Sequence, residues 1–123
     1  ILIITTGICL GIALEVSDMM NEEGKSIAVI HMPTVKPFDK ETILEYAQRV
    51  PAIITIEEHT ILGGLGSAVS EVIAEADFSV AKRFRRIGIP DMFPAEYGSQ
   101  AGQMEGFGIS TDYALKTIRE LSK

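Results

Sequence analysis

Short apolar segments alternate with amphipathic helical patterns along the whole chain. β-Branched and apolar residues concentrate in residues 1–5, 26–32, 52–57 and 84–89, which predicts four strands. Because strands this apolar are buried on both faces, we expect a mostly parallel sheet between two helix layers, with right-handed crossovers. The predicted fold class is therefore α/β, as a three-layer α/β/α sandwich.

The helix expected after Gly7 is amphipathic and ends at a glycine. Its predicted apolar stripe consists of Ile8, Ile12, Val16 and Met19. Gly24 follows, and glycine readily adopts the left-handed conformation that stops a helix.

Caps mark two of the other helices. Asp39 is expected to cap a helix that ends near residue 49, with Phe38 and Ile43 at hydrophobic-staple positions, and Ser110 is expected to cap the last helix. The helix between these two has an apolar face of Leu65, Ala68, Val69, Val72, Ile73 and Ala76. Residues 90–108 follow neither period and are rich in glycine and aromatic residues, so we expect them to wrap the domain.

Length and composition fit one compact domain over residues 1–123. The chain has 46% hydrophobic residues, and no repeat or linker-like stretch divides it. Its 11 Lys and Arg against 17 Asp and Glu give a net charge of −6, which opposes binding to nucleic acid or to an anionic membrane as a main role.

Cysteine and histidine usage predicts neither a disulfide nor a metal site. The single Cys9 lies among apolar residues and is expected to act as a small apolar filler. His31 lies within an apolar strand and is expected to be a core or strand-end histidine, so no metal site is predicted. No apolar run is long enough to cross a bilayer, and a reducing, cytoplasmic location fits.

Gly63, Gly64 and Gly66 stand at the start of a predicted helix. Their backbone N–H groups could bind a phosphate or carboxylate with help from the helix dipole. The spacing matches neither GxGxxG nor a Walker motif, and two carboxylates precede it. We favour the packing interpretation, in which the glycines let the helix approach the sheet closely.

Glu57, Glu58 and His59 form the second candidate cluster. A carboxylate beside an imidazole could serve as an acid/base pair, but adjacent residues on an extended chain point to opposite faces. The sequence shows no nucleophile or metal partner for them. We therefore favour a structural or interface role, for example Glu58 capping the N–H groups of the glycine turn.

One basic cluster precedes and enters the fourth predicted strand. It comprises Lys82, Arg83, Arg85 and Arg86, interleaved with Phe84. It could bind a phosphate or an acidic partner, although charged residues on a short strand usually solvate it and block edge pairing, which we favour.

Four ordered motifs resemble the C-terminal domain of transketolase and its thiamine-diphosphate relatives. The segment AIITIEEHTILGGLGSAVSEVIAE at 52–75 is the most specific, and EEHTILGGLGS within it favours transketolase, particularly the form whose C-terminal half is a separate subunit. The others are LIITTG at 2–7, IHMPTVKPFD at 30–39, and IGIPDMF at 87–93 with Gly98-Ser99 and FGI at 107–109.

The resemblance implies a five-stranded sheet whose first strand is antiparallel. The four strands present would then run in the order 2-1-3-4. The chain starts directly in a strand without Met, so it is expected to be a fragment of a longer chain that lacks the antiparallel strand and the upstream domains. The sheet edge at 26–32 would then be unpaired and favour association.

The same resemblance implies a transferase of the pentose phosphate type, which moves a two-carbon ketol unit between sugar phosphates. Thiamine diphosphate and Mg²⁺ would be held by the upstream domains or subunit, and this domain would supply no catalytic, cofactor-binding or metal-binding residue. The isolated domain is expected to be inactive and to support homodimer assembly or regulation.

Several alternatives remain at this point. The enzyme could be a related deoxyxylulose-phosphate synthase or the β subunit of a 2-oxoacid dehydrogenase. The chain could instead be a flavodoxin-like module that binds a small ligand through Gly7, Glu58 and the glycines at 63–66, or a free-standing enzyme with His59 as its base. Glu58, His59, Gly63, Gly64 and Gly66 are the candidate interface or anion-site residues.

Overall fold

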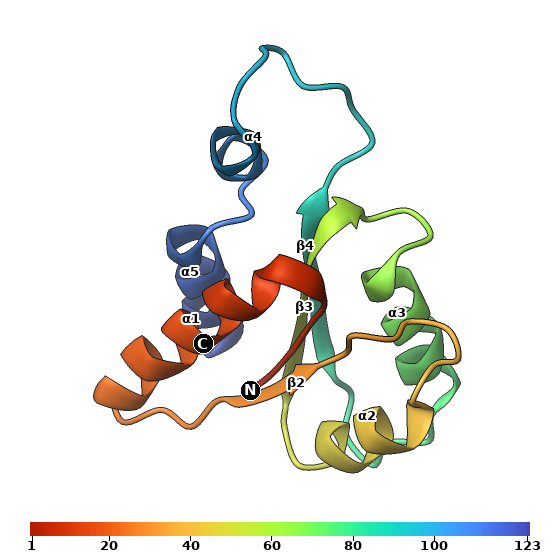
Figure 1. Ribbon diagram of the computed structural model, residues 1–123. Coiled ribbons are helices and arrows are strands. Elements are labelled where there is room, and N and C mark those ends of the chain that lie inside the picture. The colour runs from red at the N-terminus through yellow and green to blue at the C-terminus, as the bar shows by residue number, and fades with distance from the viewer.

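The computed structural model describes residues 1–123 and is built around one parallel sheet (Figure 1). The strands are β1 (Leu2–Thr5), β2 (Ala28–His31), β3 (Ala52–Thr60) and β4 (Arg83–Ile89). They run in the order β2-β1-β3-β4, and each neighbouring pair is parallel. The predicted α/β class and strand order are confirmed.

Helices cover both faces of the sheet (Figure 1). On one face lie α1 (Leu10–Glu22), which follows a short 3-10 turn η1 (Gly7–Cys9), and α5 (Thr111–Leu121). On the other lie α2 (Lys40–Ala47) and α3 (Leu65–Glu75). The short α4 (Gln100–Gly106) stands above the sheet, beyond the carboxyl ends of the strands. None of these helices is both long and apolar enough to span a bilayer.

Alternation along the strands divides the core into two clusters. Ile3 points toward α1 and α5, whereas Leu2 and Ile4 point toward α2 and α3. Parallel pairing carries the alternation across the sheet, since Ile3 pairs with Ile54 on the first face. All these side chains have no exposed surface.

The predicted helix caps are confirmed. The Asp39 carboxylate accepts hydrogen bonds from the Thr42 backbone N–H at 3.0 Å and from its hydroxyl at 2.8 Å, which lowers the pKa of Asp39. The Ser110 hydroxyl oxygen accepts from the Tyr113 N–H. Gly24 follows α1 with φ +74, as its role as a helix stop requires.

The predicted apolar stripe of the first helix is wrong at three of its four positions, where the buried residue is the next one along the chain. The buried side chains are Cys9, Ala13, Val16 and Met20, while Ile8 and Met19 are 54% and 39% exposed. The reason is local: residues 7–9 form the tight η1 turn, begun by Gly7 at φ +58, and the small Cys9 and Ala13 face the core. Small residues at these positions allow α1 to approach the sheet and α5 closely.

Residues 90–107, which we call the arm, do not wrap the domain as predicted. They project beyond the sheet (Figure 1), and α4 within them has no buried residue. Only Met104 and Phe107 pack against the core cluster near its return to α5. The lack of any helical or strand period leaves the arm without an apolar face to lay on the body of the molecule.

Candidate functional site at the carboxyl end of the sheet

A buried carboxylate joins β3 to α3. Glu57 is only 1% exposed, and its two oxygens accept hydrogen bonds from the backbone N–H groups of Leu65 at 2.7 Å and Gly66 at 2.8 Å. These N–H groups belong to the first turn of α3, where no intrahelical partner exists and the helix dipole favours a negative charge. Glu57 therefore caps the N-terminal end of α3 with a side chain from the preceding strand.

The expectation that Glu58 caps this turn is wrong, because its neighbour does so. Successive side chains on a strand point to opposite faces, and the one directed toward α3 is Glu57. Glu58 is exposed on the other side and accepts a hydrogen bond from the Gln100 side-chain amide at 2.6 Å. Glu58 thus links the end of β3 to α4 in the arm.

His59 lies closer to a backbone carbonyl than to the buried carboxylate. Its Nδ1 lies 2.8 Å from the carbonyl oxygen of Thr60 and 3.9 Å from Glu57 Oε2. A carbonyl oxygen only accepts hydrogen bonds, so Nδ1 carries the proton, and its N–H group donates a hydrogen bond to the Thr60 carbonyl. The imidazole is oriented by the main chain of its own strand.

Gly64 and Gly66 occupy crowded positions, in agreement with the packing interpretation, whereas a Cβ on Gly63 would meet nothing. A Cβ atom on Gly64 would meet the Glu57 carboxylate and lie 2.8 Å from His59 Nδ1. A Cβ on Gly66 would lie 2.7 Å from Thr55 Oγ1. Gly63 has φ +76, which residues with side chains rarely adopt. The participation of this turn in an interface stays a prediction.

Two further residues belong to the junction: Ser67, and Arg86, which the sequence predicts only as part of the basic cluster. Ser67 accepts a hydrogen bond from the Gly63 N–H at 3.0 Å and donates to the Ile61 carbonyl at 2.9 Å. Arg86 on β4 donates to the same carbonyl at 2.7 Å. The EEHTILGGLGS segment contains Ser67, but nothing in its pattern shows that the serine binds back to the turn before it.

The remaining candidates lie apart from this junction. Within the basic cluster, Lys82 donates to the Val50 carbonyl at 2.8 Å and Arg83 to the Leu121 carbonyl at 2.7 Å, so both tie strand ends to neighbouring segments. His31 is exposed at the end of β2. No three His, Cys, Asp or Glu side chains converge in a way that could hold a metal ion.

Cys9 is a poor nucleophile in this fold. It is fully buried, as expected for an apolar filler, and burial raises the pKa of its thiol to about 11, with smaller contributions from the negative charges of Glu58 and Glu57. The reactive form of a cysteine is the thiolate. At neutral pH the side chain is therefore an inert thiol.

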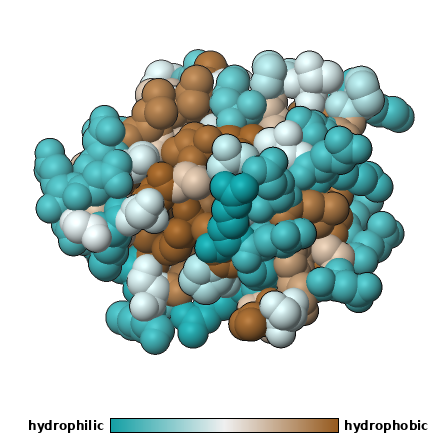
Figure 2. All heavy atoms as spheres, turned by 90° about the horizontal axis from the view of Figure 1, so that it is seen from below, coloured by the Kyte–Doolittle hydropathy of each residue, from teal (hydrophilic) through white to brown (hydrophobic).

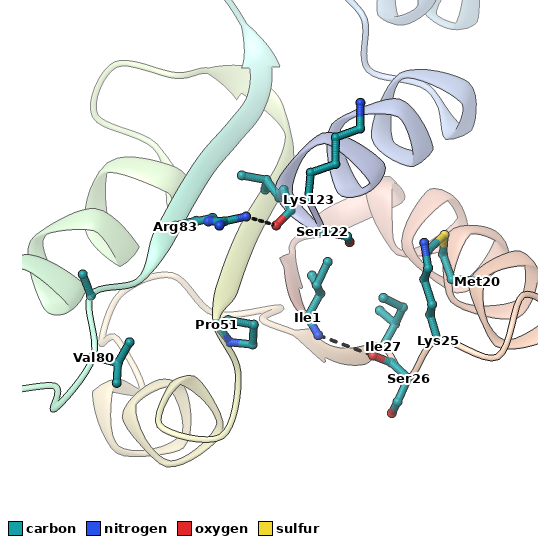
Figure 3. A pocket seen from close by; sticks show the side chains of 12 residues that line it. Ile1, Met20, Lys25, Ser26, Ile27, Pro51, Val80, Arg83, Ser122 and Lys123 are labelled. Atoms are coloured by element: carbon teal, nitrogen blue, oxygen red, sulfur yellow. Dashed lines mark hydrogen bonds between the residues drawn. The ribbon is translucent and has the colours of Figure 1, made fainter.

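A cavity of about 580 Å³ lies at the opposite end of the sheet. Figure 2 shows apolar side chains gathered at the centre of this face within a polar rim. Figure 3 shows Arg83 turned across the cavity toward the Leu121 carbonyl, and the amino group of Ile1 directed at the Ser26 carbonyl. Ile1 and Lys123 form part of its wall.

Fold and junction together define a three-layer α/β/α domain with a parallel 2-1-3-4 sheet whose carboxyl end is occupied by its own glutamate. The chain belongs to the family of the transketolase C-terminal domain, whose model matches residues 1–114.

Relatives and a solved structure agree with this assignment. The chain is 38% identical over 120 residues to 1-deoxy-D-xylulose-5-phosphate synthase of Heliobacterium modesticaldum, and 38% identical over 120 residues to an uncharacterized transketolase family protein of Sinorhizobium fredii. A split-gene transketolase, described as an inactive beta4 tetramer, superimposes with a TM-score of 0.85 at 31% identity.

The chain is much shorter than these proteins. The matches cover 98%, 97% and 98% of it, but only 18%, 34% and 38% of the synthase, the Sinorhizobium protein and the split-gene transketolase. The chain therefore spans less than two fifths of the length of each of these proteins.

Proposed function

We propose that the chain is the C-terminal domain of a transketolase, a thiamine-diphosphate-dependent transferase that moves a two-carbon ketol unit between sugar phosphates. The family match over residues 1–114 carries this proposal, and the split-gene transketolase supports it. In this view residues 1–123 are one domain of a longer, cytoplasmic enzyme.

We further propose that this domain is not catalytic. The side chains that could act as acid, base or nucleophile are engaged elsewhere: Glu57 binds the end of α3, His59 binds a backbone carbonyl, and Cys9 is a buried thiol. Three ligands suitable for Mg²⁺ do not converge. We propose that thiamine diphosphate and its Mg²⁺ are held by the other domains or subunit of the enzyme.

The role left to this domain is assembly or regulation. β2 is a sheet edge with half-buried side chains, and an additional strand could pair with it. Glu58, His59 and the glycines at 63, 64 and 66 lie at the other end of the sheet, where Glu58 already contacts the arm. We infer that the domain stabilises a homodimer of the enzyme through such surfaces.

A second candidate is the C-terminal domain of a deoxyxylulose-phosphate synthase, favoured by the 38% identity to the Heliobacterium enzyme. The two candidates differ in product. Formation of 1-deoxy-D-xylulose 5-phosphate by the enzyme that carries this chain would support the synthase, whereas ketol transfer between sugar phosphates would support transketolase.

The non-catalytic role is tested with paired variants of the enzyme that carries this domain. His59→Ala and Glu58→Gln are expected to leave kcat within about twofold, because neither group is proposed to contact reacting atoms. A loss of kcat of about a hundredfold with unchanged stability would overturn the proposal. Ketol transfer by the 123-residue chain alone, supplied with thiamine diphosphate and Mg²⁺, would also overturn it.

A further inference from the structure

The tip of the arm presents large apolar side chains to solvent. Met92 is 61% exposed, Phe93 is 94% exposed, and Tyr97 is fully exposed. Scattered surface apolar residues are ordinary, but three on one projecting segment are typical of an interaction surface. Phenylalanine and tyrosine also supply much of the binding energy at protein interfaces, because each buries a large area at a small entropic cost.

The arm is held in shape by its own hydrogen bonds. The Gln103 side-chain amide donates to the Glu96 carbonyl at 2.6 Å, which closes the loop, and the Ser99 hydroxyl oxygen accepts from the Gly102 N–H at 3.2 Å. Gln100 ties its base to Glu58. A preorganised segment loses less conformational entropy when it binds than a flexible one does.

Charge is distributed asymmetrically between the arm and β4. Residues 87–115 contain no Lys or Arg, and the acidic residues Asp91 and Glu96 flank the exposed apolar side chains. The basic cluster at 82–86 lies just before this stretch, and none of its members forms an ion pair with a carboxylate. The Arg85 guanidinium donates to a single acceptor, the carbonyl of Phe84 at 2.9 Å.

These two regions lie at opposite ends of one open sheet edge. β4 is an edge strand; its amino half carries Arg83 and Arg85, and the arm leaves from its carboxyl end. Both arginines pair in register with residues of the α1/α5 face, Ala52 and Ile54. The base of the arm packs on that same face through Met104 and Phe107.

A two-fold axis perpendicular to the sheet would bring these regions together. Two β4 edges related by such an axis run antiparallel and keep the α1/α5 faces on the same side. The carboxyl end of one β4 then lies beside the amino end of the other. The acidic, aromatic arm of one copy would meet the basic half of the partner β4, and the reverse contact would form by symmetry.

We propose that the arm docks on the β4 edge of a second copy of this chain, with Phe93 and Tyr97 as apolar anchors and Asp91 and Glu96 facing Arg83 and Arg85. The inference deepens the assembly role under Proposed function and rests on it. It assigns that role to a surface at the β4 edge, distinct from the β2 edge. Charged side chains on β4 serve here as the recognition element.

The test uses two charge-reversed forms of the 123-residue chain. One carries Asp91→Lys and Glu96→Lys in the arm, and the other carries Arg83→Glu and Arg85→Glu at β4. In a homodimer of either form, both symmetric contacts place like charges together. We expect each to dissociate at least about tenfold more readily than the unaltered chain in sedimentation equilibrium, because facing like charges oppose association.

Mixing the two forms gives the decisive measurement. In a mixed pair, the reversed arm meets the reversed β4 and the unaltered arm meets the unaltered β4, so both contacts are restored. We expect a mixed dimer about as tight as that of the unaltered chain. Unchanged self-association of both forms, a monomeric unaltered chain, or mixed forms that stay apart would each overturn the inference.

Controls separate this result from folding and from the family activity. Glu71→Lys changes the charge of an exposed residue on α3, outside both the arm and β4, and should leave the dissociation constant unchanged. Circular dichroism melting curves establish that every variant is folded. Ketol transfer by the enzyme that carries this domain is measured separately, so absent activity would contradict the proposed function without bearing on the dimer contact.

Discussion

Two strand-to-helix connections leave the carboxyl end of the same sheet in opposite ways. After β3 the chain turns through residues 61–64 and enters α3, whose first turn is bound by Glu57. After β4 it runs through residues 90–99 before α4, a helix without a buried residue. Polar groups of the first connection form hydrogen bonds inside the domain. The second connection exposes apolar side chains to solvent.

The difference shows how one sheet end serves stability and recognition at once. Burying a carboxylate is unfavourable unless its oxygens are hydrogen-bonded, and Glu57 meets that requirement with two N–H groups. The arm has no comparable contacts with the body of the molecule apart from Glu58, Met104 and Phe107. Changes in the first connection should therefore lower the free energy of unfolding of the domain, whereas changes in the second should leave it nearly unchanged.

The largest expected effect is that of Gly64→Val. The new side chain would overlap the Glu57 carboxylate and crowd His59, so we expect a loss of about 3 kcal/mol in the free energy of unfolding. Urea denaturation measures it. Gly11→Val on the exposed side of α1, where a Cβ meets nothing, should change the same quantity by no more than about 0.5 kcal/mol. Equal stability of the two variants would contradict the packing role of Gly64.

Glu57→Gln should have the next largest effect. The amide oxygen can accept one N–H group of α3, but its NH₂ group faces the other, so a buried donor loses its partner at a cost of about 2 kcal/mol. The matched variant Glu58→Gln is exposed and should cost less than about 0.5 kcal/mol in the same denaturation experiment. The reverse ranking would mean that Glu58 supports the junction after all.

Two serine caps compare the arm with the body of the domain directly. Ser110→Ala removes the cap of α5, whose apolar face is buried, and should lower the free energy of unfolding by about 1 kcal/mol. Ser99→Ala removes the cap of α4 and should leave global unfolding unchanged, because α4 opens without unfolding the core. Thermal melts report the first effect, and faster amide exchange confined to α4 reports the second.

The smallest effect concerns the Cys9 thiol. Its pKa is raised from 9.0 to about 11, chiefly by burial and then by Glu58 and Glu57. The unfolded chain releases this proton at lower pH, so the thiol contributes stability below about pH 9 that is lost as the pH rises to about 11. Thiolate absorbance during a pH titration checks the pKa. Glu58→Gln should lower it slightly, whereas Glu71→Gln on α3 should not.

Much of the fold could be predicted from the sequence because its signals are local. The caps at Asp39 and Ser110, the stop at Gly24 and the four apolar strands each depend on neighbouring residues, and all appear in the structure. The sequence pattern predicts that Met19 is buried, whereas the structure buries Met20. The η1 turn before α1 changes which side of the helix faces the sheet, and no residue pattern marks that turn.

The candidate site was harder to predict because its contacts are not local. The choice between Glu57 and Glu58 depends on strand orientation, and β3 continues to Thr60 through an irregular register against β4. Glu57 also finds its partners eight and nine residues further along the chain. The hydrophobic residues of the arm follow neither a helical nor a strand period, so no apolar face packs on the body of the molecule. The arm therefore projects from the sheet.

Glu57 can be regarded as a ligand covalently attached to its own binding site. A free anion at the end of α3 would bind according to its concentration, and it would compete with phosphate and other solutes. A tethered carboxylate is present at every protein concentration and cannot diffuse away. The junction between β3 and α3 therefore keeps the same occupancy whatever anions the surrounding solution contains.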